Sequence, residues 1–327
     1  MDEASYRIHE EKLWEAEGGV LPKERRIDLA HVGCTVRLME LGEGPPVLFL
    51  PGAPNGGATW AALVQRLDGF RCLILDRPGT GLSDPLPRVP SPEDLLAIGD
   101  TLVDDILDGL DIPRAHVVAS SLGGFFALRS AAKSHDRFWR MVQMGTPAFS
   151  KGMKRPMFMA FLSLGIFRRL LNSLEPNVNS SKNILRQVGH GESIDAGKIP
   201  AHFFDWYVAL QKYTDTMKND GAMIGNIGTF FGGFSPVLTI PDDLLRSVRI
   251  PTLFYCGRGE DALGGGQPVV GPMAATMPNA ELQMVPQAGH LPWLDEPQAS
   301  AQATHHCLRL RLLRRTEALL LRNLTIK

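Results

Sequence analysis

The chain has 327 residues and a formal net charge of −1, with 44% hydrophobic and 21% charged residues. This composition is typical of a globular protein with one large domain and an insertion, or with two domains. A net charge so close to zero excludes a whole-protein field that would attract nucleic acid or acidic lipid, so we expect no nucleic-acid partner.

The cysteines and the apolar runs indicate the compartment. Four cysteines are widely scattered without a CxxC pair, which argues against both metal ligation and a disulfide framework. Residues 1–17 are charged and lack the apolar segment of a signal peptide. No run reaches the roughly 20 apolar residues that a membrane span needs. These features predict a cytoplasmic protein without a membrane span, and they leave its oligomeric state open.

The predicted elements follow an α/β pattern. Residues 1–24 are interpreted as a short N-terminal helical extension, and two antiparallel strands come next. Apolar strands then alternate with helices. The predicted strands cover residues 26–30, 36–41, 46–50, 72–75, 115–119, 139–144, 252–256 and 282–285, and the predicted helices 61–67, 92–110, 122–132 and 271–277. This alternation predicts a mostly parallel sheet with helices on both faces, and in such sheets functional sites lie at the carboxyl ends of the strands.

The alternation stops between residues 148 and 215, where helix-like runs over 157–174 and 202–217 occur without a strand. We interpret 148–215 as a helical cap, or lid, inserted after the sixth strand, so that 25–147 and 216–327 form the core. Most of its many Met and aromatic side chains are expected only to pack the lid onto the core. The candidates for a substrate pocket are Met157, Phe161, Phe203, Trp206 and, from the core, Trp293.

Ser121 has the sequence context of a nucleophile elbow. It follows the apolar strand 115–119 and precedes a helix-like run, with Ala119 and Gly123 two residues to either side. A strained strand–turn–helix projects the central side chain, and small residues at these positions prevent Cβ clashes. The register selects Ser121 over Ser120. The alternative interpretation is an ordinary Ser-Gly helix start after a buried strand.

A histidine and a carboxylate complete a candidate catalytic triad. His290 lies in a loop after the last predicted strand, on the same sheet edge as Ser121. Asp261 follows the 252–256 strand and is the favoured partner to orient the imidazole, with Glu260 as the alternative one residue earlier. No carboxylate lies between residues 144 and 174, so the order is Ser…Asp…His. The alternative for the two acids is a solvated loop.

The predicted oxyanion hole needs two backbone N–H donors aimed at the developing charge. One is the amide of Leu122, directly after the nucleophile and at a helix N-terminus. The second is the amide of Ala53, in the Pro-Gly-Ala-Pro loop that follows the 46–50 strand. The alternative is a simple Pro-Gly turn.

Together these residues resemble the α/β-hydrolase superfamily, in its lidded branch of serine esterases and epoxide-hydrolase-like proteins. The resemblance runs from about residue 26 to residue 297. It includes the loop at 51–54, similar to the family's His-Gly-x-Pro. It also includes Asp-Arg-Pro-Gly-Thr-Gly-Leu-Ser-Asp at 76–84, similar to Asp-x-x-Gly-x-Gly-x-Ser and interpreted as structural. The expected fold is therefore the α/β-hydrolase fold.

The sequence departs from the family pattern at two places. Pro51 stands where the family has a histidine that usually braces the oxyanion loop. Beyond residue 297 the resemblance fades into a Leu/Arg-rich tail, 308–327, with six basic residues and one acidic residue. We interpret this tail as a final helix with a basic outer face, and a peripheral membrane or partner contact is the alternative.

The resemblance implies two-step acyl transfer on a small-molecule ester with an apolar moiety, with no metal or organic cofactor. Alternatives on the same triad are carbon–carbon bond hydrolysis of a diketone-type acid, a thioesterase and a perhydrolase. A carbon–carbon hydrolase would place cationic side chains near the substrate carboxylate, and Arg168, Arg169 and Arg186 are the candidates. A non-catalytic ligand-binding protein on the hydrolase fold is the alternative from another class.

Overall fold

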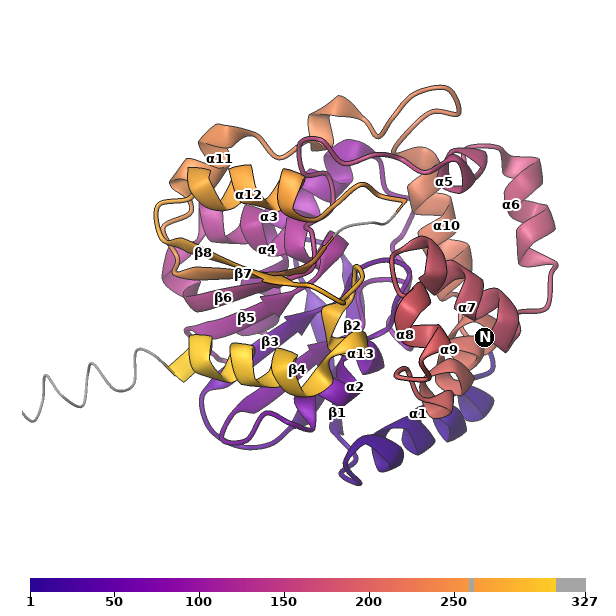
Figure 1. Ribbon diagram of the computed structural model, residues 1–327, viewed down its shortest axis with the longest axis horizontal. Coiled ribbons are helices and arrows are strands. Elements are labelled where there is room, and N and C mark those ends of the chain that lie inside the picture. Colours follow the sequence, from indigo (N-terminus) through magenta and orange to yellow (C-terminus); the bar gives the residue numbers. More distant parts are fainter. Residues whose placement is uncertain (259–261, 310–327) are drawn as a thin grey trace, which may run out of the picture.

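The computed structural model describes residues 1–258 and 262–309, and an eight-stranded sheet runs through its centre (Figure 1). The strand order is β1-β2-β4-β3-β5-β6-β7-β8. β1 pairs antiparallel to β2 and β2 to β4, and the other neighbours are parallel. The strands are β1 (Lys23–Leu29), β2 (Cys34–Leu41), β3 (Pro46–Leu50), β4 (Arg71–Leu75), β5 (Ala115–Ala119), β6 (Phe138–Met144), β7 (Thr252–Gly257) and β8 (Ala280–Val285). The predicted mostly parallel sheet is confirmed.

Successive residues of the central strands enter two separate apolar cores, one on each face of the sheet. In β5, which is buried along its whole length, Val117 and Ala119 belong to one core and Val118 to the other. This is why these strands read as continuous apolar runs in the sequence.

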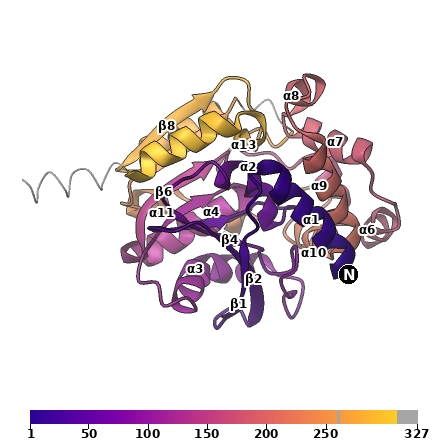
Figure 2. The ribbon, with the colours of Figure 1, turned by 90° about the horizontal axis from the view of Figure 1, so that it is seen from below.

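Helices cover both faces of the sheet (Figures 1 and 2). One face carries α3 (Pro92–Asp108), α4 (Ser121–Lys133), α11 (Asp242–Ser247) and α12 (Gln267–Thr276). The other carries α2 (Ala61–Val64), α13 (Pro292–Asp295) and the helical residues 297–309. In the described part of the chain, no helix is both long enough and apolar enough to cross a membrane.

Six helices form an insertion between β6 and β7 and lie together at one end of the sheet in Figure 1. They are α5 (Met157–Phe161), α6 (Gly165–Asn172), α7 (Val178–Gln187), α8 (Gly191–Asp195), α9 (Ala201–Tyr213) and α10 (Thr216–Asn226). We call them the inserted helices. The predicted cap boundary at residue 215 falls just before α10, but α10 packs against α5, α6 and α9. This packing groups α10 with the other inserted helices, and the position of the cap boundary stays a prediction.

The N-terminal helix α1 (Glu3–Glu17) lies against α9 (Figure 2). A buried group of charges joins it to the core. Arg37 of β2 is 1% exposed and donates to Glu10 of α1 at 2.6 and 2.7 Å, and to Asp76 at 2.7 Å. Arg37 also pairs with Glu24 at 2.8 Å. One guanidinium thus bridges three carboxylates and ties the N-terminal helix to the sheet.

Replacing Arg37 with methionine is expected to lower the free energy of unfolding by about 3–5 kcal/mol, because Glu10 and Asp76 would stay buried without a counter-charge. Arg25→Met is the matched control, since Arg25 pairs with Glu40 at 2.8 Å but its side chain is 53% exposed. Its effect should stay within about 1 kcal/mol. Chemical denaturation measures both, and equal losses would contradict the role given to the buried charges.

Candidate active site

The backbone at Ser121 is strained in the way that an elbow requires. Ser121 has φ +51°, in the left-handed region that a side-chain-bearing residue rarely occupies, whereas Ser120 is extended at φ −133°. A Cβ on Gly123 would lie 2.2 Å from the carbonyl oxygen of Leu50, so only glycine fits beside the turn. The structure therefore places Ser121, and not Ser120, at the apex between β5 and α4.

The loop after β3 lies directly on Ser121. A Cβ built on Gly52 would come 2.7 Å from the Cβ of Ser121. Ala53, the next residue, is half-buried, and Leu122 is the second residue of α4, in the first turn, where backbone N–H groups lack partners within the helix. The two amides predicted to hold an oxyanion therefore flank the serine on two different elements.

The loop of Gly52 and Ala53, which is the predicted oxyanion loop, is held from outside by two side chains. Arg77 Nη2 donates to the carbonyl oxygen of Gly52 at 3.0 Å, and the hydroxyl of Tyr207 on α9 donates to that of Pro54 at 3.5 Å. Burial raises the pKa of Tyr207, so its hydroxyl stays protonated as a donor. No sequence motif predicts either of these two hydrogen bonds.

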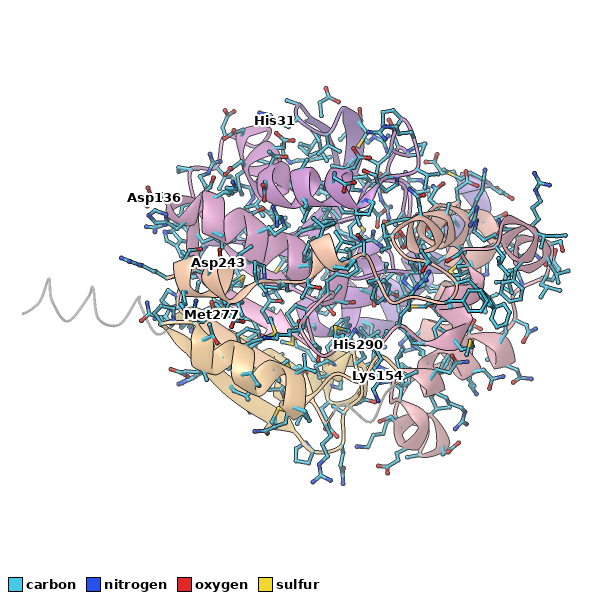
Figure 3. All side chains as sticks on the ribbon, turned by 90° about the horizontal axis from the view of Figure 1, so that it is seen from above. His31, Asp136, Lys154, Asp243, Met277 and His290 are labelled. Atoms are coloured by element: carbon cyan, nitrogen blue, oxygen red, sulfur yellow. The ribbon has the colours of Figure 1, made fainter. Side chains whose placement is uncertain are left out.

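His290 lies in the loop after β8, where the core meets the inserted helices (Figure 3). His290 is 7% exposed, and its backbone N–H donates to the carbonyl oxygen of Val188 at 2.9 Å. A Cβ on Gly289 would lie 2.7 Å from the carbonyl carbon of Gly189. The segment between α7 and α8 therefore packs directly on the histidine loop.

A second histidine and an aspartate fix the same loop. His190 and Asp295 are both buried, with Nδ1 of His190 3.0 Å from Oδ1 of Asp295. The amide of Gly289 donates to Asp295 at 2.8 Å, and that of Leu291 donates to Nε2 of His190 at 3.2 Å. Because Nε2 accepts, the ring proton is assigned to Nδ1, which donates to Asp295. Sequence reasoning missed this pair, whose members are 105 residues apart.

The predicted acid, Asp261, and its alternative, Glu260, lie outside the described residues, as does the tail from residue 310. The last residue of β7, Gly257, approaches the histidine loop so closely that a Cβ there would lie 2.1 Å from the carbonyl oxygen of Ala288. The segment that carries both acids therefore begins beside the loop that carries His290. Asp261 stays a prediction.

Comparison with known proteins identifies the family. A sequence model of the Alpha/beta hydrolase family matches residues 47–303. The chain belongs to the α/β-hydrolase family. A 2-hydroxy-6-oxo-6-phenylhexa-2,4-dienoate hydrolase from Burkholderia cepacia is 24% identical over 273 residues, covering 81% of this chain and 87% of that protein. A 2-hydroxy-6-oxononadienedioate/2-hydroxy-6-oxononatrienedioate hydrolase from Cupriavidus pinatubonensis is 26% identical, covering 78% and 83%.

Solved structures show the same fold for this α/β-hydrolase. The carboxylesterase CesB from Bacillus subtilis has a TM-score of 0.67 at 17% identity, covering 94% of this chain and 98% of its own. A meta-cleavage product hydrolase from Pseudomonas fluorescens has a TM-score of 0.66 at 17% identity, covering 87% and 97%. The named relatives and neighbours are hydrolases, which supports hydrolase activity without separating esters from other substrates.

Two residues predicted to line the substrate pocket of this α/β-hydrolase are core residues. Trp206 is fully buried, and its indole N–H donates to the hydroxyl of Tyr6 at 3.1 Å. Trp293 is fully buried, stacks on Trp60 at 3.9 Å between centroids, and donates to the carbonyl oxygen of Thr59 at 2.8 Å. Their place in a substrate pocket has no support in these contacts, because both rings are used to join α1, α9 and α13 to the core.

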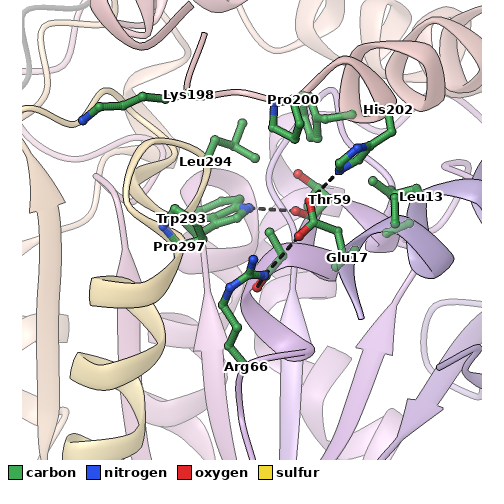
Figure 4. A pocket seen from close by; sticks show the side chains of 15 residues that line it. Leu13, Glu17, Thr59, Arg66, Lys198, Pro200, His202, Trp293, Leu294 and Pro297 are labelled. Carbon is green, nitrogen blue, oxygen red and sulfur yellow. Dashed lines mark hydrogen bonds and ion pairs between the residues drawn. The ribbon is translucent and has the colours of Figure 1, made fainter. Parts of the chain in front are cut away.

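The pocket of Figure 4, about 260 Å³, lies at the joint between α1, α2, α9 and α13. Phe203 and Trp293 line it, but Ser121 and His290 do not. Across it, Glu17 pairs with His202 at 2.8 Å and with Arg66 at 3.0 Å. Phe203 therefore faces a cavity that neither Ser121 nor His290 lines, and its assignment to the substrate pocket stays a prediction.

The other two predicted pocket residues belong to α5. Met157 is 69% exposed, and Phe161 is half-buried against Phe167 and Phe230, at 5.0 and 5.2 Å between ring centroids. Their assignment to the substrate pocket stays a prediction.

Replacing His190 with alanine is expected to slow reactions at Ser121 roughly 10- to 100-fold, because the loop that carries His290 loses its hold and small misplacements cost that much. His202→Ala is the matched control, since it removes a partly exposed histidine–carboxylate pair elsewhere in the inserted helices. The measurement is the rate of labelling by a fluorophosphonate. Equal rates in the two variants would show that His190 does not position the loop.

Proposed function

We propose that this α/β-hydrolase cleaves carboxylic esters with an apolar moiety, with Ser121 as nucleophile, His290 as general base and Asp261 as its orienting acid. The observation that carries the proposal is the left-handed backbone at Ser121, with Gly52 packed against its Cβ. Strain of this kind persists only where the surrounding structure maintains it, and it is concentrated at functional sites. An elbow of this geometry presents a serine hydroxyl to a substrate carbonyl.

In the proposed reaction, His290 removes the proton of Ser121 as Oγ attacks the ester carbonyl carbon. The amides of Ala53 and Leu122 donate to the oxyanion of the tetrahedral intermediate. His290 then protonates the leaving alcohol, and an acyl-enzyme remains. Water, deprotonated by His290, attacks the acyl carbon and releases the acid and the serine hydroxyl.

The arginines of the inserted helices favour a neutral substrate over an anionic one. Arg186 pairs with both carboxylate oxygens of Asp195, and Arg168 donates to the carbonyl oxygen of Leu162. Arg169 is exposed on α6. Arg168 and Arg186, two of the three arginines considered for a substrate carboxylate, thus already have partners within the protein. This supports an ester substrate without a free acid group.

Carbon–carbon bond hydrolysis is the second candidate, because the sequence relatives named above are hydrolases of a 2-hydroxy-6-oxo-dienoate and of a 2-hydroxy-6-oxo-dienedioate or -trienedioate. Such a substrate contains a ketone and a carboxylate but no ester, so hydrolysis must break a bond between carbon atoms. Attack of Ser121 on the ketone would form the same acyl-enzyme, with a carbon leaving group. The elbow and the two amides serve both reactions.

The wild type is expected to hydrolyse p-nitrophenyl esters and to be labelled by a fluorophosphonate, and Ser121→Ala should lose both activities. Because Ser120 is buried and extended, Ser120→Ala should keep both and is the matched control. A series of esters of graded acyl length, with kcat/KM measured for each, gives the preferred substrate size.

Two results would redirect this proposal. Turnover of 2-hydroxy-6-oxo-6-phenylhexa-2,4-dienoate with a kcat/KM above that of every ester would establish the second candidate. A folded wild type that is neither labelled nor active on any of these substrates would favour a ligand-binding protein on the hydrolase fold.

The acid is tested by two neighbouring substitutions. Asp261→Asn should reduce kcat by roughly 10³–10⁴-fold, because the imidazole loses the carboxylate that selects its tautomer. Glu260→Gln should have little effect. Ester hydrolysis under saturating substrate measures both, and the reverse ranking would assign the role to Glu260.

A further inference from the structure

The brace on the oxyanion loop is a buried arginine from the segment that follows β4. Arg77 is 3% exposed, and its Nη2 lies 3.0 Å from the carbonyl oxygen of Gly52. That carbonyl and the N–H of Ala53 belong to one planar peptide unit, in which they point in opposite directions. Holding the Gly52 oxygen therefore fixes the direction of the Ala53 amide.

The side chains of Pro51 and Gly52 cannot hold the peptide between Gly52 and Ala53. Pro51 has no backbone N–H and no polar side chain, so it cannot donate a hydrogen bond to its own loop. Gly52 carries no side chain because Ser121 occupies the space where a Cβ would lie. The orientation of the Gly52–Ala53 peptide must then be set from outside the loop.

Arg77 is itself held by α10. Its Nη2 and Nη1 lie 2.7 and 3.3 Å from the two carboxylate oxygens of Asp220, which is also 3% exposed. Burial raises the pKa of Asp220, and the Arg77 charge opposes this rise. A buried pair with two such contacts holds both partners in one geometry.

The same face of α10 binds the rest of the segment. The amide of Gly81 donates to the hydroxyl of Thr216 at 2.9 Å, and the side-chain amide of Asn219 donates to the carbonyl oxygen of Gly79 at 2.9 Å. Thr216, Asn219 and Asp220 are spaced as neighbours on one helix face. The inserted helices therefore reach the oxyanion loop through a continuous set of hydrogen bonds.

We propose that Arg77 is a positioning residue for the oxyanion hole, which aims the Ala53 amide by holding the Gly52 carbonyl, and that Asp220 of α10 fixes Arg77 for this task. This inference rests on the proposed function, because it takes the Ala53 amide as an oxyanion donor. In this proposal, the ion pair between Arg77 of the core and Asp220 of the insertion braces the loop, which Pro51 cannot do.

The proposal predicts a loss in kcat with little change in KM, because the Ala53 amide acts on the transition state. Arg77→Met should reduce kcat roughly 100-fold, within the range for loss of one oxyanion donor. Arg77→Lys should retain part of the activity, since one ammonium can still reach one acceptor. Asp220→Asn should lower kcat less than Arg77→Met, because one hydrogen bond to Arg77 survives.

Arg26→Met is the matched control. Arg26 donates to the carbonyl oxygen of Leu82 and pairs with Asp84, so it makes the same kinds of contact at the far end of the same segment. Its kcat should equal that of the wild type. Thermal unfolding of every variant shows whether the fold is kept, and the lysine and asparagine variants test the proposal if Arg77→Met does not fold.

A transition-state analogue separates positioning from a purely structural role. The affinity for a trifluoromethyl ketone, which forms an oxyanion on Ser121, should fall in Arg77→Met by the same factor as kcat/KM, whereas the affinity for the product acid should not change. An unchanged kcat, or a rise in KM alone, would overturn the proposal, and the second result would show that Arg77 binds substrate.

Fluorophosphonate labelling distinguishes this failure from that of the proposed function. No labelling of the wild type would overturn both. A labelled wild type and an Arg77→Met variant labelled at the same rate would overturn only the role of Arg77.

Discussion

The left-handed backbone at Ser121 is the constraint on which the rest of the site depends. Such a conformation costs about 1–3 kcal/mol and needs neighbours that leave no alternative. The amide of Ser120 donates to the carbonyl oxygen of Leu50 at 3.0 Å, and that of Ala148 donates to the carbonyl oxygen of Ser121 at 2.9 Å. Loops after three adjacent parallel strands, β3, β5 and β6, are thereby locked to one another, and the serine is held at their meeting point.

The inserted helices contact the loops of the candidate site directly. On one side, α10 reaches the loop of Gly52 through Asp220 and Arg77. On the other, the segment between α7 and α8 contacts the loop of His290 through the carbonyl of Val188 and the ring of His190. The loop of Gly52 and the loop of His290 are therefore both attached to the insertion by hydrogen bonds between buried groups, which are costly to break.

Sequence patterns were sufficient for features with a local signal. Apolar runs predicted the sheet, because strands buried on both faces are mostly apolar and do not alternate with exposed polar residues. The small residues around Ser121 predicted the strained turn, because Gly123 has no room for a Cβ. Contacts between residues far apart in the chain could not be predicted. The ion pair of Arg77 and Asp220 is an example, because its members are 143 residues apart. The place of Trp206 could not be predicted either, because an apolar residue on a helix does not reveal whether it faces a ligand or the core.

The two attachments differ in chemistry, and this difference matters for how the site responds to substrate. The Arg77–Asp220 pair is ionic, so it resists displacement only while both groups stay away from water. The His190 contact depends on a neutral ring whose Nε2 accepts a hydrogen bond. Because Arg77 and Asp220 are each 3% exposed, the pair is shielded from water before any substrate binds. In the proposed function, the Ala53 amide would then be aimed at the oxyanion in advance, and no reorganisation would be needed at the moment of reaction.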